Sequence, residues 1–168
     1  LGLVSGLHLK HLVDVLEQNI GVGGQRVATR LIAHFAQENP TYLRGRIHGL
    51  PPNSIKLVLR AVHLSDSSAG LEAATSLCQH GDSDVQMEVL SILKEARYSG
   101  RVGLSLVKLA SSPTERVRIA AVEELGRIRE TRAFDGLLEA WSGRAFQDLP
   151  KPEAIAIGTA LARIDAGK

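Results

Sequence analysis

The chain has 168 residues, of which 44% are hydrophobic and 23% are charged, with a formal net charge of +2. These values are those of a folded protein and exclude a disordered chain. No stretch reaches the roughly 18 apolar residues of a membrane span, so we expect no transmembrane segment. Cys78 is the single cysteine, which excludes an internal disulfide and a thiolate metal cluster and favours a reducing compartment. We therefore expect a cytoplasmic protein.

Two helical hairpins are predicted in the first part of the chain, at about 7–38 and 41–64. Apolar residues recur in both with helical spacing, as in the second half of the first hairpin, where Val27, Leu31 and Ile32 share one stripe. Glycines and prolines interrupt the pattern between the helices, because they end a helix or cannot continue it.

Three further hairpins are predicted at about 69–97, 101–129 and 132–164. The second helices of all five hairpins align with five residues in register, namely Val27, Ser54, Val85, Val117 and Glu153. A period of about 30 residues is typical of stacked helical repeats. The predicted fold is therefore all-α: a right-handed superhelical stack, or α-solenoid, of about five hairpins that form a single domain over 1–168.

The ends of such an array need polar caps, because a terminal repeat otherwise exposes the apolar surface that its neighbour would cover. The chain starts at Leu1, within the apolar run Leu-Gly-Leu-Val. We expect a fragment of a longer protein, and self-association through an exposed array end is one of its predicted properties.

Residues 115–128, ERVRIAAVEELGRI, resemble the second helix of a bacterial HEAT-like repeat. Residues 132–141, RAFDGLLEAW, look like the first helix of the next repeat, and 82–86, DSDVQ, is similar to the junction in the preceding one. The resemblance covers 69–141 in detail. It implies an α-solenoid whose second helices line a concave face, which in this family is usually a platform for a protein or peptide.

In HEAT-like proteins an arginine of the second helix often forms a ladder with acidic residues at the turns. Arg118 matches the arginine position, and Asp84 is its candidate partner. The ladder is expected to be mostly missing, because the aligned residues of the other repeats are Ala28, Ile55, Gln86 and Ala154.

Basic residues gather in one part of the sequence. Between Arg26 and Arg60 six basic residues stand against the single acid Glu38. Two pairs among them, Arg26 with Arg30 and Lys56 with Arg60, have helical i, i+4 spacing in neighbouring second helices, which predicts a positive stripe on the concave face. Such a stripe suits an acidic protein segment or a nucleic-acid backbone. The low aromatic content of 4% disfavours nucleic acid, since few bases would find a stacking partner.

Other chemical patterns are weaker. His8 and His11 have a two-ligand spacing, but no third ligand completes a site in the sequence, which favours solvated or capping histidines. The glycine-rich run Gly21–Arg26 opens a helix and would suit an anion, yet it lacks a preceding strand, so an inter-helix turn is the preferred interpretation. Trp141 lies on an apolar stripe, which favours a packing role over an aromatic-walled cleft.

The predicted function is a non-catalytic protein–protein interaction or scaffolding module, without a catalytic, cofactor-binding or metal-binding residue. The alternative is a HEAT-like domain that binds nucleic acid through the basic 26–60 region, and the third hypothesis is a repeat-built enzyme of the DNA glycosylase or bilin lyase type. The candidate partner-binding residues are Arg26, Arg30, Lys56, Arg60, Gln86 and Arg116.

Overall fold

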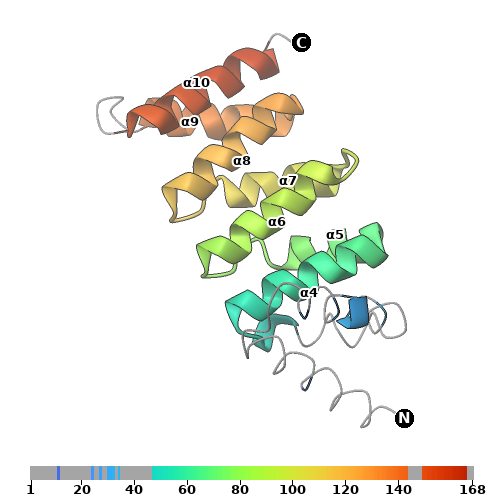
Figure 1. Ribbon diagram of the computed structural model, residues 1–168. Helices are drawn as coiled ribbons and strands as arrows, with labels where there is room; N and C mark the ends of the chain where they lie inside the picture. The colour runs from blue at the N-terminus through green and yellow to red at the C-terminus, as the bar shows by residue number, and fades with distance from the viewer. Residues whose placement is uncertain are drawn as a thin grey trace. The chain divides into compact units, whose positions relative to one another are not determined.

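The computed structural model describes most of the chain from Ile47 onward (Figure 1). The described residues are 11, 24, 27, 30–32, 34, 47–143 and 149–165. Every regular element within these residues is helical, so the all-α prediction is confirmed. The contacts between Cα atoms divide the chain into two compact units, 1–77 and 78–168. The predicted hairpin at 7–38 lies mostly outside the described residues, and the single domain stays a prediction.

The described helices of the first unit are a short 3-10 helix, η1 (Ile47–Gly49), and the α-helices α4 (Pro52–Ser65) and α5 (Ser67–Ser76). Proline in the first turn of α4 is well tolerated, because the amide it lacks would have no partner there. Of the hairpin predicted at 41–64, the described elements are η1 and α4.

One residue, Asp66, both ends α4 and begins α5. Its amide donates to the carbonyl of Val62 at 2.8 Å, and its carboxylate accepts hydrogen bonds from the amides of Ser68 and Ala69 at 2.9 and 3.1 Å. The two helices then pack closely, since a Cβ on Gly70 would lie 2.7 Å from the Cβ of His63.

The second unit contains six helical elements within the described residues: α6 (Ser83–Glu95), α7 (Gly100–Leu109), α8 (Glu115–Arg127), η2 (Thr131–Ala133), α9 (Phe134–Gly143) and α10 (Lys151–Asp165). These bounds agree with the helices predicted for the last three hairpins to within a few residues.

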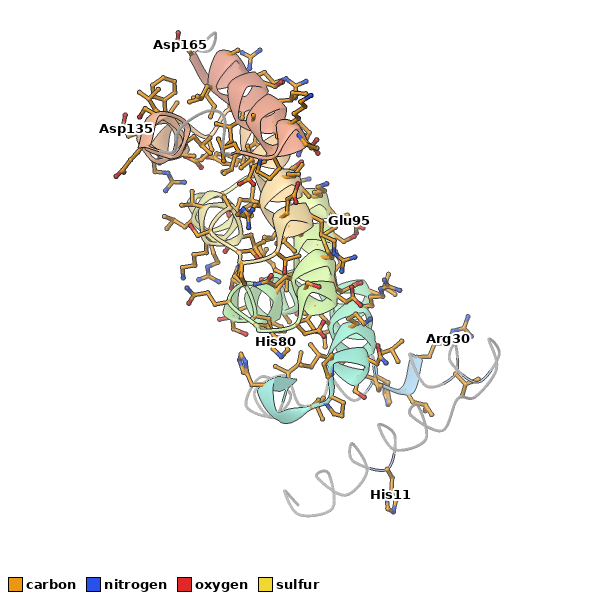
Figure 2. The ribbon with its side chains drawn as sticks, turned by 90° about the vertical axis from the view of Figure 1, so that its left-hand side faces the viewer. His11, Arg30, His80, Glu95, Asp135 and Asp165 are labelled. Atoms are coloured by element: carbon orange, nitrogen blue, oxygen red, sulfur yellow. The ribbon has the colours of Figure 1, made fainter. Side chains whose placement is uncertain are left out.

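The helices of the second unit form two layers (Figures 1 and 2). One layer holds α6, α8 and α10, with α8 in contact with both neighbours. The other layer holds α7, which packs on α6 and α8, and α9, which packs on α10. The core between the layers is aliphatic and fully buried at Val85, Val89, Leu93, Leu106, Leu109, Val117, Leu125, Ile157 and Ile164.

The helix ends are set by local hydrogen bonds. The carboxylate of Asp82 accepts from the amides of Asp84 and Val85 at 2.9 and 3.0 Å and so starts α6. At the end of α8 the chain turns through Arg129, which has a left-handed φ of 53°. The amide of Glu130 then donates to the carbonyl of Leu125 at 3.0 Å, which is the six-residue closure of a Schellman motif.

Two residues assigned to a buried stripe by their spacing, Val27 and Leu31, are exposed, and those assignments were wrong. Val27 and Leu31 are 59% and 47% exposed, whereas Ile32 beside them is buried. Leu138 is 44% exposed, although its neighbour Leu137 is buried. Val27 and Leu31 are one turn apart and share one side of their helix, whereas Ile32 points about 100° away from Leu31. None of the helices in the described residues is both long enough and apolar enough to cross a membrane.

Candidate interaction surface

The basic stripe predicted from the sequence falls in the first unit. Arg26 lies outside the described residues. Arg30 and Arg60 are exposed, and Lys56 is half-buried one turn before Arg60 on α4. The structure thus places both arginines where solvent reaches them, and the joining of the two pairs into one stripe stays a prediction.

Gln86 of α6 lies in the protein interior. Its amide nitrogen donates to the carbonyl of Cys78 at 3.2 Å, and its amide oxygen accepts from the hydroxyl of Ser112 at 2.7 Å. Because both ends of the amide are engaged within the protein, Gln86 offers little to a partner, and we assign it a structural role.

Arg116 of α8 is exposed, as the concave-face hypothesis requires. Its guanidinium forms an ion pair with Asp84 of α6 and a hydrogen bond of 3.2 Å with the hydroxyl of Ser83. Both charged side chains are more than half exposed, so solvent screens the pair and it contributes little to stability. The pair does fix the alignment of α6 with α8.

The predicted partnership of Arg118 with Asp84 was wrong. Arg118 instead binds Glu153 of α10 through two parallel hydrogen bonds, both 2.8 Å long. A third nitrogen donates to the carbonyls of Ser112 and Pro113, both at 3.0 Å. Two positions along a helix differ by about 200° in direction, so Arg116 and Arg118 face opposite neighbours.

Gln86 of α6 and Arg118 of α8 occupy the same position in two aligned helices and make corresponding contacts. Each is one residue beyond its register position, Val85 or Val117, and each binds the turn before its own helix and a residue of the following repeat. Arg118 with Glu153 supplies the arginine–carboxylate contact expected at one step, whereas Gln86 makes a neutral contact with Ser112 at the aligned position of α6.

A second polar cluster, which the sequence did not predict, joins the turns that follow α6 and α8. Glu130 is only 2% exposed and accepts hydrogen bonds of 2.8 Å from Tyr98 and from two nitrogens of Arg132. The guanidinium of Arg132 holds the pKa of Glu130 at about 2, below its ordinary 4.5. Gly103 leaves room for the carboxylate, since a Cβ there would overlap it. This cluster is structural, because the carboxylate is saturated with donors.

Three apolar side chains point outward from the layer of α6, α8 and α10. Each lies two residues after its register position, on the side of its helix away from the core, and we call the set the apolar row: Met87, Ile119 and Ile155. Met87 and Ile119 are half-buried, and Ile155 is 69% exposed.

The alignment of the helices places the members of the apolar row beside one another. The Asp84–Arg116 pair lies three residues before Met87 and Ile119, so these two side chains stand at the same height on neighbouring helices. On α10, Glu153 meets Arg118, and a Cβ on Gly126 would lie 2.7 Å from the Cα of Ala160. From the first of these contacts to the second, the residue number rises on both helices, so α8 and α10 run parallel. Ile155 therefore lies within one turn of Ile119.

Polar residues border the apolar row on both sides. The Asp84–Arg116 pair stands before it, and the exposed residues Ser91, Glu123 and Thr159 follow one turn after it. An apolar strip with a polar rim has the composition of a small binding surface. The sequence contained a signal for it, namely apolar residues at one repeated offset outside the buried stripe.

Groups suited to metal or nucleophilic chemistry are scarce in the described part of the chain. No cluster of three or more His, Cys, Asp or Glu residues there has the geometry to hold a metal ion. His80 accepts a hydrogen bond from the amide of Asp82 at 3.0 Å, which is a capping role. Cys78 is buried, and this burial raises the pKa of its thiol. Comparisons with protein families, curated proteins and solved structures find no match to this chain.

Proposed function

We propose that this protein is a non-catalytic binding module of HEAT-like stacked helices, which holds a protein or peptide segment on the outward face of α6, α8 and α10. The observation that carries the proposal is the apolar row, in which the half-buried Met87 and Ile119 and the exposed Ile155 stand on three neighbouring helices. In a HEAT-like stack this layer of second helices would form the concave face.

The spacing of the row favours an extended partner. Packed helices lie about 8–10 Å apart. A polyproline II segment rises about 3.1 Å per residue and returns to the same face every third residue, so its side chains at i, i+3 and i+6 are about 9 Å apart. We therefore propose a partner segment with apolar residues at that spacing, lying across the three helices.

Polar contacts at the rim would set the direction and register of the bound segment. Arg116 can accept a carboxylate at the expense of its exposed pair with Asp84, which is weak. Glu123 stands on the other side of the row. A partner with an acidic residue toward Arg116 and a basic residue toward Glu123 fits these charges.

Selection from a random peptide library on the whole chain tests the proposal. We expect enrichment of peptides with apolar residues three apart, and loss of their binding in the variant Ile155→Glu. Complete burial of an isoleucine contributes about 1.5–3 kcal/mol, so the loss should exceed about tenfold in affinity. The matched control is Ala162→Glu, which adds the same charge at an exposed residue of α10 two turns away, beyond the polar rim. Binding that tolerates Ile155→Glu would refute the proposed surface.

The nucleic-acid alternative depends on other residues and stays a prediction. Arg30 and Arg60 are exposed in the first unit, and a backbone ligand there should lose affinity steeply between about 50 and 200 mM salt. Charge reversal at Arg26, Arg30, Lys56 and Arg60 together would abolish such binding and leave selected peptides on the apolar row unaffected.

A further inference from the structure

The layer of α7 and α9 has an exposed surface of its own, on the side away from α8 and α10. Figure 2 shows Asp135 of α9 on this side and Glu95 of α6 on the opposite side of the second unit. The exposed residues that share this side follow helical spacing of three, four and seven. We call them the outer patch: Arg101, Leu104 and Lys108 of α7, and Asp135, Leu138 and Glu139 of α9.

The centre of the outer patch is apolar. Leu104 and Leu138 are 54% and 44% exposed, and each is the fifth residue of its helix. The N-terminal ends of the two helices lie side by side, because Arg132, two residues before α9, donates to the carbonyl of Gly100 at 3.3 Å. The two leucines therefore stand at the same height on neighbouring helices.

The charges around the leucines are separated by helix. The α7 side of the patch is basic, with Arg101 and Lys108, and the α9 side is acidic, with Asp135 and Glu139. Among the residues that the structure describes, none of these four groups forms a hydrogen bond or ion pair with another residue.

We propose that two copies of this chain associate face to face through the outer patch, about a two-fold axis that runs parallel to α7 and α9 between them. Such an axis exchanges the two helices across the contact, so α7 of one copy faces α9 of its partner. The basic side then meets the acidic side twice, and the leucines meet in the centre. Opposite charges around an apolar centre are what complementary interfaces require.

The size of the patch sets the strength of the association. Each of the two helices has ten residues and is about 15 Å long, so the contact falls below the roughly 1,200–2,000 Å² of a standard interface. We expect a weak dimer, with a dissociation constant of about 0.1–1 mM at low salt. Association should weaken as salt rises, because the charges are exposed.

Sedimentation equilibrium of the whole chain, with paired charge reversals, tests the proposal. The variant R101E/K108E carries a wholly acidic patch, and D135K/E139K carries a wholly basic one. Each alone should associate at least tenfold more weakly than the wild type, because like charges meet twice. An equimolar mixture of the two should form a heterodimer, and this recovery shows that both variants are folded.

The control variant K94E/K151E changes the net charge as R101E/K108E does, but on exposed lysines of α6 and α10. It should associate as the wild type does. A wild type that stays monomeric at about 1 mM and low salt would overturn the proposal and leave the patch to another occupant. Equal association of all variants, or no heterodimer on mixing, would overturn it too. Ile155→Glu should leave self-association unchanged, so this test is independent of the peptide-binding proposal.

Discussion

Arg118 of α8 and Glu153 of α10 form a bidentate ion pair in which both nitrogen–oxygen distances are 2.8 Å. The carboxylate side chain is 5% exposed and the guanidinium side chain 17%. A buried charge that loses its partner is costly, whereas the intact pair is close to neutral relative to well-packed apolar residues. The pair therefore specifies how α8 and α10 align more than it stabilises the fold.

The first prediction concerns this pair. Arg118→Ala should lower the free energy of unfolding by about 3–5 kcal/mol, because Glu153 stays buried without its guanidinium. The double variant Arg118→Leu with Glu153→Leu should recover most of that loss. Arg116→Ala is the control, since it breaks an exposed pair and should cost at most about 1 kcal/mol. Urea denaturation measures all three, and equal losses for Arg118→Ala and Arg116→Ala would contradict the assignment.

The second prediction concerns the space at Gly103. Gly103→Ala places a methyl group where the Glu130 carboxylate lies and should destabilise the protein by about 1–3 kcal/mol through overpacking. Gly136→Ala is the matched control, because nothing lies within 4 Å of the added Cβ. Alanine is the better helix former there, so that variant should gain about 0.5–1 kcal/mol. Thermal unfolding compares the two, and a neutral Gly103→Ala would show that the carboxylate is placed differently.

The third prediction is a pH dependence due to Glu130. The pKa of its carboxyl is about 2 in the folded protein, against an ordinary 4.5, chiefly because Arg132 donates hydrogen bonds to the charged form. A depressed folded-state pKa adds stability above about pH 4.5 that is lost as the pH falls toward 2. The difference in unfolding free energy between wild type and Glu130→Gln should therefore shrink over that range. A constant difference would show that the carboxylate does not titrate as described.

The fourth prediction concerns the turn after α8. Arg129 adopts a φ of 53°, a conformation that costs a residue with a side chain about 1–2 kcal/mol. Arg129→Gly removes this strain, and the greater freedom of glycine in the unfolded chain offsets part of the gain. We expect a net stabilisation of about 0.5–1 kcal/mol in urea denaturation. Arg129→Ala keeps the strain and should show no gain. If Arg129→Ala stabilised the protein as much as Arg129→Gly, the effect would come from the lost charge and not from the backbone.

The helices could be predicted from the sequence because their signals are local. Asp66 and Asp82 cap helices with their own carboxylates, as short polar residues before a helix commonly do, and Val85 and Val117, which the repeat pattern puts in register, are both buried. The partners of the polar side chains could not be predicted, because they depend on how each helix is rotated about its own axis. Asp84 pairs with Arg116 and not with Arg118, a difference of two positions on one helix.

The candidate surface was only partly predictable for the same reason. Gln86 was a candidate partner-binding residue, yet it is buried between its own turn and Ser112. The apolar row needs the register of three helices before Met87, Ile119 and Ile155 can be seen to share one face. No single hairpin contains that information.

The most direct test of the binding surface uses the single methionine of the chain, Met87, which lies at one end of the apolar row. Protein labelled at the methionine methyl group gives one resonance, which needs no assignment. Titration with a selected peptide should shift this resonance with the same dissociation constant that calorimetry gives, and Ile155→Glu should abolish the shift while Ala162→Glu keeps it. A peptide that binds by calorimetry and leaves the Met87 resonance unmoved would contradict the proposed surface.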